Sequence, residues 1–188
     1  MACVDVYLET ERLVLRRFTA SDVDLLAELY SDPEVMRFLT GRATPREEIE
    51  SYVLPAILRR YDEYPGLGTL AAEQRTGGVF VGWFGLQPTS VPTTVDVGYR
   101  LNRTAWGKGY ATEGTRALTD KAFGELGMQR VVADTMAVNH RSRAVMRRSG
   151  LRFVRIFHQH FDDPLPGTEF GEVEYAVDRR TWEAGRRA

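Results

Sequence analysis

Polar and apolar residues alternate in some segments of this chain and recur at helical spacing in others. Alternation predicts strands at residues 9–18, 70–75, 79–87, 94–101, 130–136, 153–161 and 172–178. Apolar positions three and four residues apart predict helices at residues 21–30, 44–64, 111–126 and 139–149. The resulting order, β-α-α-β-β-β-α-β-α-β-β, is typical of an α/β fold with a sheet of mixed direction.

Turn and cap residues set several of these boundaries. Thr44, Pro45 and Glu47 form a capping-box pattern with proline at the first helical position, so a helix should begin there. Pro55 lies inside that predicted helix and should kink it. The sequence Thr76-Gly77-Gly78 separates two predicted strands by a short turn, which predicts a β-hairpin.

Composition narrows the class of protein. The chain has 188 residues, 43% of them hydrophobic, which predicts a single domain spanning residues 1–188. A net charge of −1 argues against partners such as nucleic acid or an anionic membrane. The three histidines lack metal-ligand spacing, so no metal is expected, and the one cysteine, Cys3, cannot form an internal disulfide. The sequence shows no leader-like or membrane-spanning segment, so we expect a cytoplasmic location.

The segment from Trp106 to Glu113, WGKGYATE, is the most informative part of the chain. Gly107 and Gly109 have no side chain to keep an anion away from the backbone N–H groups. The helix predicted to follow would direct its unpaired N–H groups and its positive dipole end at the same place. The segment therefore predicts a site for a phosphate-bearing ligand.

Two nucleotide interpretations of this segment can be weighed from the residues. A nucleoside triphosphate loop needs Ser or Thr after its lysine, but Gly109 follows Lys108. A dinucleotide site is favoured by Gly107, Gly109 and the later Asp134, which ends a predicted strand. Thr112 occupies the third glycine position of that pattern, and about half the chain precedes it. A nicotinamide-dependent enzyme therefore stays as an alternative.

Four segments in order resemble the GNAT superfamily of N-acetyltransferases, and in particular its RimJ/RimL-type branch of ribosomal-protein alanine acetyltransferases. They are Asp96-Val-Gly-Tyr-Arg-Leu, the WGKGYATE segment, Asn139-x-x-Ser142 and Ser149-Gly-Leu-Arg-Phe153. The resemblance extends from Thr10-Glu11-Arg12-Leu13 to Glu174-Tyr175, nearly the whole chain. It implies a central mixed, mostly antiparallel twisted sheet flanked by helices, with two strands splayed apart at the acyl-CoA site.

The resemblance also implies a donor site for acetyl-CoA as co-substrate. The pyrophosphate would be bound by backbone amides of Gly107, Lys108, Gly109, Ala111 and Thr112, and the pantetheine arm would lie along the strand at Tyr99, Arg100 and Leu101. The same resemblance places Trp106, Tyr110, Asn139 and Ser142 at this site. Glu113 would repel a pyrophosphate, so we expect its carboxylate to point away. One arginine among Arg141, Arg143, Arg147 and Arg148 could contact the 3′-phosphate of CoA.

Acetyl transfer to an amine needs a proton acceptor, because an unperturbed alkylammonium is almost wholly protonated at neutral pH. Asp96 matches the acidic residue that many family members carry on the central strand, and it could act as the base through a water or only attract the cationic substrate. A backbone N–H near Tyr99 or Arg100 would hold the developing oxyanion. Met146 occupies the position of the usual tyrosine acid and cannot donate a proton, which leaves Ser142 or water for that role.

The acceptor is not defined by the sequence. A small-molecule amine and a protein N-terminus both stay open, as does a homodimer. His158 and His160 would share one face of a predicted strand, so one of them could line an acceptor pocket. A group of acids near the C-terminus could attract a cationic amine: Asp162, Asp163, Glu169, Glu172 and Glu174. A catalytically degenerate CoA-binding module, motivated by Met146 and by the short Asp96, is the alternative to an enzyme.

Overall fold

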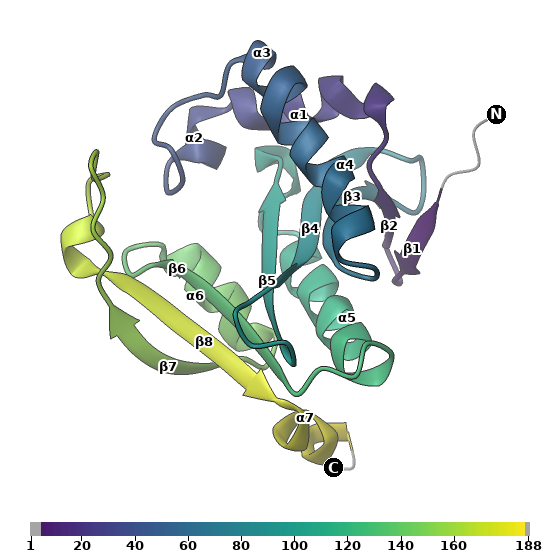
Figure 1. The fold of residues 1–188 in the computed structure, drawn as a ribbon, viewed down its shortest axis with the longest axis vertical. Coiled ribbons are helices and arrows are strands. Elements are labelled where there is room, and N and C mark those ends of the chain that lie inside the picture. The colour runs from purple at the N-terminus through teal and green to yellow at the C-terminus, as the bar shows by residue number, and fades with distance from the viewer. Residues whose placement is uncertain (1–4, 187–188) are drawn as a thin grey trace.

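The computed structural model describes residues 5–186. They form one eight-stranded sheet with helices packed against it (Figure 1). Its spatial order is β1-β2-β3-β4-β5-β6-β8-β7, and only the β5–β6 pair is parallel. The strands are β1 (Val6–Glu9), β2 (Leu13–Arg17), β3 (Gly68–Gln74), β4 (Phe80–Pro88), β5 (Thr94–Leu101), β6 (Arg130–Met136), β7 (Arg152–Phe157) and β8 (Glu172–Asp178). The predicted mixed, mostly antiparallel sheet is confirmed. Cys3 lies outside the described residues.

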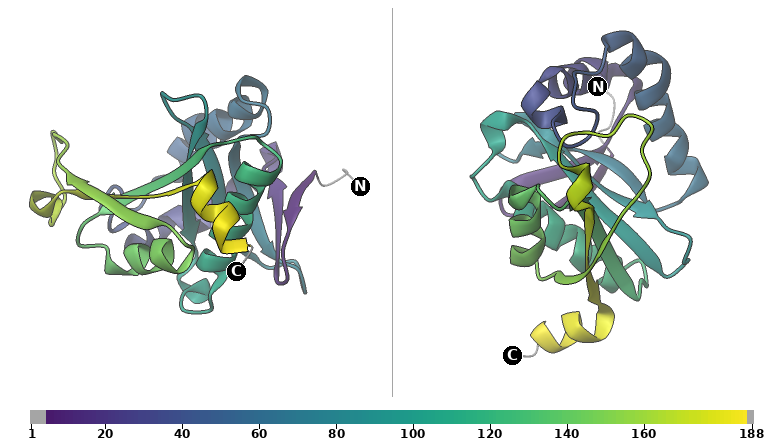
Figure 2. Two further views of the ribbon diagram at one scale, coloured as in Figure 1. Left: turned by 90° about the horizontal axis from the view of Figure 1, so that it is seen from below. Right: turned by 90° about the vertical axis from the view of Figure 1, so that its left-hand side faces the viewer.

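Helices cover both faces of the sheet (Figures 1 and 2). One face carries α1 (Val23–Ser31), α2 (Pro33–Met36), α3 (Arg46–Glu48) and α4 (Leu54–Glu63), joined by short turns η1 (Ala20–Asp22) and η2 (Ile49–Val53). The other carries α5 (Tyr110–Gly124) and α6 (His140–Arg148). The remaining elements are η3 (Arg103–Ala105), η4 (Thr168–Phe170) and the C-terminal α7 (Arg179–Arg186).

The alternation of strand side chains divides the interior into two apolar clusters. Leu70 and Ala72 on β3 belong to the cluster beneath α5, whereas Ala71 belongs to the cluster beneath α1 and α4. On α5, Leu118 and Phe123 are fully buried against the sheet. Burial of this apolar surface is the main favourable term holding the helices on the sheet.

The strands β5 and β6 separate after a short common stretch. Their parallel pairing joins Thr94 to Arg130, Val95 to Val131 and Asp96 to Val132, and it ends there. Beyond Asp96, β5 continues to Leu101 paired only with β4, so its edge toward β6 is open. This is the splay that the resemblance implied, and it leaves Asp96 at the point where the strands part.

Two strand predictions need correction. The strand predicted over residues 9–18 is shorter, since β2 covers only Leu13–Arg17. Glu9 ends β1, a strand that the pattern did not predict, and the chain turns between the two at Thr10, whose amide donates to the Leu13 carbonyl at 2.8 Å. The strand predicted over 153–161 ends at Phe157. The following residues form a loop, so His158 and His160 do not share a strand face, and His160 is almost fully exposed.

The predicted helix over residues 44–64 forms as one continuous helical run over 46–63, in which the π-helical segment η2 lies between α3 and α4. No side-chain cap forms at its start, since Pro45 is the N-cap and α3 begins at Arg46. A wide π turn, η2, precedes α4, and Pro55 lies in the first turn of α4. Proline has no N–H to donate and its ring crowds the carbonyl four residues earlier, which accounts for a widened turn directly before Pro55.

Other boundaries follow the prediction closely. The strands β5, β6 and β8 have the predicted limits, and the hairpin of β3 and β4 forms around the predicted glycines. The pattern did not indicate α2 or α7, since α2 is a single turn and α7 is strongly polar. Within residues 5–186, no helix is long and apolar enough to cross a membrane.

Candidate active site

The glycine loop between β5 and α5 leaves its backbone donors without protein partners. Gly107 and Gly109 both adopt left-handed backbone conformations, with φ of 74° and 86°, which glycine accepts at little cost. The amide of Glu113 is the first of α5 to bond within the helix, to the Gly109 carbonyl at 3.0 Å. Among the described residues, no protein acceptor receives a hydrogen bond from the amides of Gly107 through Thr112. The arrangement fits an anionic ligand bound by several N–H groups.

Side chains from the N-terminal strands hold this loop from outside. Arg12 donates to the Lys108 carbonyl at 2.9 Å and forms an ion pair with Glu113 at 2.6 Å. The Thr10 hydroxyl also donates to Glu113, at 2.6 Å. The Glu113 carboxylate is thus committed to the turn between β1 and β2, in agreement with the structural role predicted for it. Trp106 donates its indole N–H to the Leu101 carbonyl at 2.8 Å, which closes the other end of the loop.

A groove of about 1860 Å³ runs from this loop along the open edge of β5 to the start of α6. Its lining combines the glycine loop, including Trp106, Tyr110, Ala111 and Thr112, with Tyr99, Arg100 and Leu101 of β5 and Asn139 and Ser142 of α6. Lys108 is the one predicted loop residue that does not line it. A groove of this length fits an extended ligand with an anionic end at the glycine loop.

The arginines predicted near a CoA phosphate have different surroundings. Arg141 and Arg148 line the groove, and the Arg141 guanidinium lies 5.0 Å from the centre of the Trp106 ring system. Arg143 instead donates to the Ala137 carbonyl at 2.7 Å and so braces the start of α6. Arg147 is exposed and does not line the groove. Of the four arginines predicted as candidates for a contact to the 3′-phosphate of CoA, Arg141 and Arg148 are the two that line the groove.

At the start of α6, Asn139 caps the helix and Ser142 faces β5. The Asn139 side-chain oxygen accepts a hydrogen bond from the Ser142 amide at 3.2 Å. The hydroxyl groups of Ser142 and Tyr99 lie 2.9 Å apart. Burial raises the pKa of Tyr99 to about 12, although the Ser142 contact opposes that rise. The two hydroxyl groups therefore form a hydrogen-bonded pair beside the point where β5 and β6 separate. From the sequence, only the backbone of Tyr99 was expected to take part in the site.

Met146 lies one turn after Ser142 on α6 and is almost fully buried. Its thioether packs in the apolar cluster with Leu151 and Tyr175. It carries no proton to donate. The coupled hydroxyls of Tyr99 and Ser142 are the nearest described alternative along this side of the groove.

Asp96 lies where β5 and β6 diverge, with its side chain in the groove. Burial, together with the negative charges of Asp134 and Glu174, raises the pKa of Asp96 to about 7. Within the described residues, no cation forms an ion pair with it. A carboxylate whose pKa lies near neutral pH can both hold and release a proton under physiological conditions.

Arg100 has its side chain on the α1 face of the sheet. Its guanidinium lies 4.1 Å from the centre of the Tyr30 ring and 5.3 Å from that of Trp83. Burial lowers the pKa of Arg100. This stacking makes Arg100 a brace between α1 and the sheet, while its backbone lies on the open β5 edge predicted to accommodate pantetheine.

The dinucleotide alternative is not supported by the fold. A doubly wound domain needs a largely parallel sheet around the glycine loop, and this sheet has one parallel pair. Asp134 lies on β6 opposite Glu174 of β8 and lines the groove and a second cavity. The resemblance of Gly107 and Gly109 to a nicotinamide motif is therefore local only.

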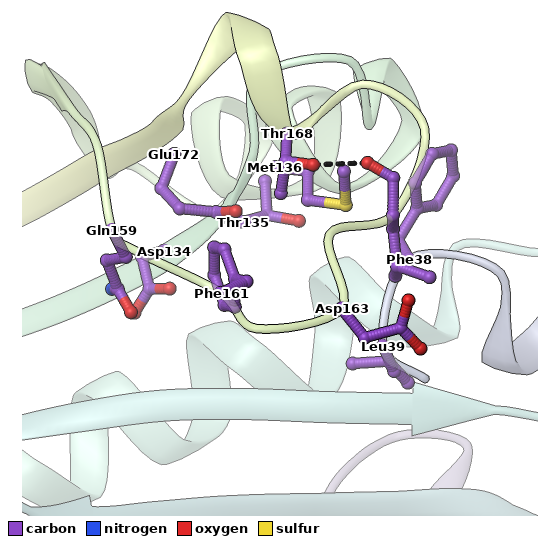
Figure 3. Close-up of a pocket in the computed structure, with 11 residues that line it drawn as sticks. Phe38, Leu39, Asp134, Thr135, Met136, Gln159, Phe161, Asp163, Thr168 and Glu172 are labelled. Atoms are coloured by element: carbon purple, nitrogen blue, oxygen red, sulfur yellow. Dashed lines mark hydrogen bonds between the residues drawn. The ribbon is translucent and has the colours of Figure 1, made fainter. Parts of the chain in front are cut away.

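The second cavity has a volume of about 300 Å³ and shares Phe38, Leu39, Asp134 and Thr135 with the lining of the groove. Figure 3 shows the side chains around it. The segment after α2 contributes Phe38 and Leu39, and the loop after β7 contributes Phe161 and Asp163. Of the acids predicted to attract an amine, only Asp163 and Glu172 line it; Asp162, Glu169 and Glu174 do not. Neither His158 nor His160 lines it. Sequence analysis missed Phe38 and Leu39, because only the fold brings their segment to β6.

Comparison with known proteins identifies the class that this fold and groove define. The protein-family model for the acetyltransferase (GNAT) domain matches residues 12–152 of this chain. An FsC-acetyl coenzyme A-N(2)-transacetylase from Aspergillus fumigatus is 36% identical over 185 residues, covering 93% of this chain and 77% of that protein. The chain belongs to the GNAT family of acetyltransferases, and it is an acyltransferase of the N-acetyltransferase type.

Solved structures show the same fold. A GNAT-family acetyltransferase from Bacillus anthracis superposes with a TM-score of 0.78 at 23% identity, covering 92% of this chain and 98% of that one. RimL, a ribosomal L7/L12 alpha-N-protein acetyltransferase solved in complex with coenzyme A, superposes with a TM-score of 0.77 at 20% identity, covering 93% and 98%. Coenzyme A is thus a ligand of a protein with this architecture.

Proposed function

We propose that this chain transfers the acetyl group of acetyl-CoA to a primary amine by direct attack of the amine on the thioester in a ternary complex. The observation that carries the proposal is the run of amides from Gly107 to Thr112 without protein acceptors at the mouth of α5. A diphosphate needs several N–H donors at once, and a helix N-terminus adds a favourable dipole. The open edge of β5 beyond Asp96 fits the amide groups of a pantetheine arm.

In this proposal Asp96 accepts the proton that the amine must lose. Its pKa of about 7 is close to the working pH, so the carboxylate is a competent base while still being partly protonated at neutrality. The same negative charge attracts the ammonium form of the acceptor. The position of Asp96 at the divergence of β5 and β6 supports this role, because the amine and the thioester would meet there.

Ser142 is proposed to protonate the departing CoA thiolate, in place of the tyrosine that Met146 replaces. The contact between the Ser142 and Tyr99 hydroxyls supports a short proton path on the groove side of α6. A thiol is acidic enough that this step needs little assistance. A backbone N–H of β5 near Tyr99 or Arg100 would stabilise the oxyanion.

Similarity to RimL and to the FsC transacetylase supports a wider set of proposals. Residues 1–188 would form one acetyltransferase domain related to the RimJ/RimL-type branch. The acceptor would be a small-molecule amine or a protein N-terminus; RimL is named an alpha-N-protein acetyltransferase, and the fungal relative an N(2)-transacetylase. A homodimer is compatible with either.

Thiol release from acetyl-CoA across a panel of amines tests the proposal. We expect amine-dependent thiol release with at least one amine, and mass spectrometry should show the acetylated product in equal amount. A reaction without amine controls for simple hydrolysis. Tight CoA binding with no release on a broad panel would instead support a CoA-binding module without turnover.

A further inference from the structure

The cavity beside Asp96 combines apolar walls with carboxylates. Its apolar lining comes from three separate segments, with Phe38 after α2, Met136 at the end of β6, and Phe161 in the loop after β7 (Figure 3). The two loops that bound it come together, since a Cβ at Gly41 would lie 2.5 Å from the Leu165 side chain. Its volume of about 300 Å³ is at the lower end for small-molecule sites.

Glu172 is the least exposed acid in this cavity, with 7% of its surface accessible. Within residues 5–186, it forms no ion pair and no hydrogen bond through its side chain. The contrast with Glu174, two residues later on β8, is informative, because Glu174 pairs with Arg155 at 2.8 Å and Arg130 at 3.8 Å. The Glu172 carboxylate oxygens are open to the cavity, so a cationic group supplied from outside the chain would give this carboxylate the partner that no described residue provides.

Two further carboxylates, both more exposed than Glu172, line the same cavity, and in the part of the chain that the structure describes neither forms an ion pair. Asp134 connects the cavity to the groove that holds Asp96, and Asp163 lies on the opposite loop (Figure 3). Burial and, to a lesser extent, the negative charge of Asp134 raise the pKa of Glu172. Among the described residues, no three His, Cys, Asp or Glu side chains are placed to hold a metal ion. The aromatic walls also suit an organic cation.

We infer that the cavity binds a second positively charged group of the acceptor, so that the preferred substrate is a diamine or polyamine rather than a simple monoamine. The inference rests on the proposed function, since the reacting amine would lie at Asp96 while the distal ammonium lies among Asp134, Asp163 and Glu172. The alkyl chain between the two nitrogens would contact Phe38 and Phe161. A monoamine of equal length would leave the carboxylates unpaired.

The test compares 1,5-diaminopentane with n-pentylamine, which share one chain length. We expect kcat/KM for thiol release to be higher for the diamine by about tenfold or more, as a partly buried charge pair would produce. Glu172→Gln should remove most of this preference, measured as the ratio of kcat/KM for the diamine to kcat/KM for n-pentylamine in the same variant. Calorimetric titration of the diamine into the protein with bound CoA gives a second readout that needs no turnover.

Asp163→Asn and Asp162→Asn provide a matched pair in the same loop. Asp163 lines the cavity, whereas Asp162 is fully exposed and does not. We expect Asp163→Asn to reduce diamine preference and Asp162→Asn to leave it unchanged. Equal kcat/KM for the two amines, or equal effects of the two loop variants, would overturn the inference. Absence of thiol release with every amine would overturn the proposed function instead, and the calorimetric result would then decide the inference separately.

Discussion

At the scale of single residues, we expect the charge state of Asp96 to affect both activity and stability. The side chain lies among other acids at the splay of β5 and β6, and its pKa is raised to about 7 by burial, Asp134 and Glu174. Sequence analysis identified this residue from the resemblance alone. The pKa could not be predicted, because Asp134 and Glu174 approach Asp96 only through the pairing of β5, β6 and β8.

The first prediction concerns the pH dependence of turnover. In the wild type, kcat/KM should rise as pH increases through about 7, because the base must lose its proton. Asp96→Asn should lower kcat/KM about 100-fold at neutral pH and abolish the rise of kcat/KM near pH 7, with unchanged CoA affinity. Asp134→Asn is the control: removing one negative neighbour should lower the pKa of Asp96 and move this rise to more acidic pH. A full rate in Asp96→Asn would remove Asp96 from the chemistry.

The raised pKa of Asp96 also makes the stability of the folded protein depend on pH. The pKa of Asp96 in the folded protein is raised above its usual value of 3.8. Protonation of this carboxyl group therefore stabilises the folded state at acidic pH, and this stabilisation is lost as pH rises through about 7. Asp96→Asn should therefore be more stable than the wild type above pH 7, by roughly 2–4 kcal/mol. Urea denaturation at acidic and alkaline pH measures the difference, which should vanish at acidic pH.

The second prediction concerns the coupled hydroxyls of Tyr99 and Ser142. If they form one proton path, Tyr99→Phe and Ser142→Ala should each lower kcat by about tenfold, and the double variant should be no slower than the slower single variant. Such non-additivity is the sign of residues that act as a unit. Fully multiplicative losses would show that the 2.9 Å contact has no shared role in turnover. Retained CoA affinity in each variant would separate this effect from loss of the donor site.

At the scale of elements, the loop before α5 depends on glycine for access as well as for conformation. Gly107 and Gly127 form a matched pair: their φ values are 74° and 71°, and a Cβ at either would meet nothing within 4 Å. Gly107 lines the groove and Gly127 ends the segment after α5. The difference between the two positions is therefore access to the groove.

The third prediction uses this pair. Gly107→Trp should weaken CoA binding by at least about 100-fold, because the side chain would obstruct the loop amides. Gly127→Trp carries the same backbone strain and should leave CoA affinity within about twofold. Calorimetry measures the affinities, and circular dichroism checks that both variants are folded. Equal affinities for the two variants would place the pyrophosphate elsewhere.

The fourth prediction concerns how closely α5 packs on the sheet. Gly114 lies on the buried side of α5, where a Cβ would approach the Phe84 ring to 2.4 Å, whereas a Cβ at Gly124 of the same helix would meet nothing within 4 Å. Gly114→Ala should therefore destabilise the fold by about 1–3 kcal/mol. Gly124→Ala should be neutral or stabilising by about 0.5–1 kcal/mol, since alanine favours helix. Chemical denaturation compares them, and equal midpoints would contradict the close contact.

Elements also show which parts of the fold can be read from sequence. The limits of β5, β6 and β8 follow from alternation, because these strands are bounded by polar or glycine-rich turns. The late start of β2 does not, since the turn that precedes it is held by Thr10 and Arg12, which contact Glu113 about a hundred residues later. The early end of β7 also depends on tertiary structure, because the residues that follow Phe157 form a loop that lines the cavity.

At the scale of the whole molecule, the splay of β5 and β6 brings together two spaces with different chemistry. The groove begins at unpaired amides and suits an anionic donor, whereas the cavity is lined by unpaired carboxylates and suits a cationic acceptor. They meet at Asp134 and Thr135, next to Asp96. Ordered motifs predicted the groove. The cavity could not be predicted in the same way, since its walls come from loops that carry no motif.

The central claim is that the amides at the start of α5 bind the diphosphate of acetyl-CoA, and amide NMR tests it most directly. In a titration of isotopically labelled protein with CoA, we predict the largest chemical-shift changes and new exchange protection at Gly107, Lys108, Gly109, Ala111 and Thr112. Changes at the exposed Gly127 should be negligible. Saturable CoA binding that leaves those five amides unchanged, with the largest shifts elsewhere, would contradict the account.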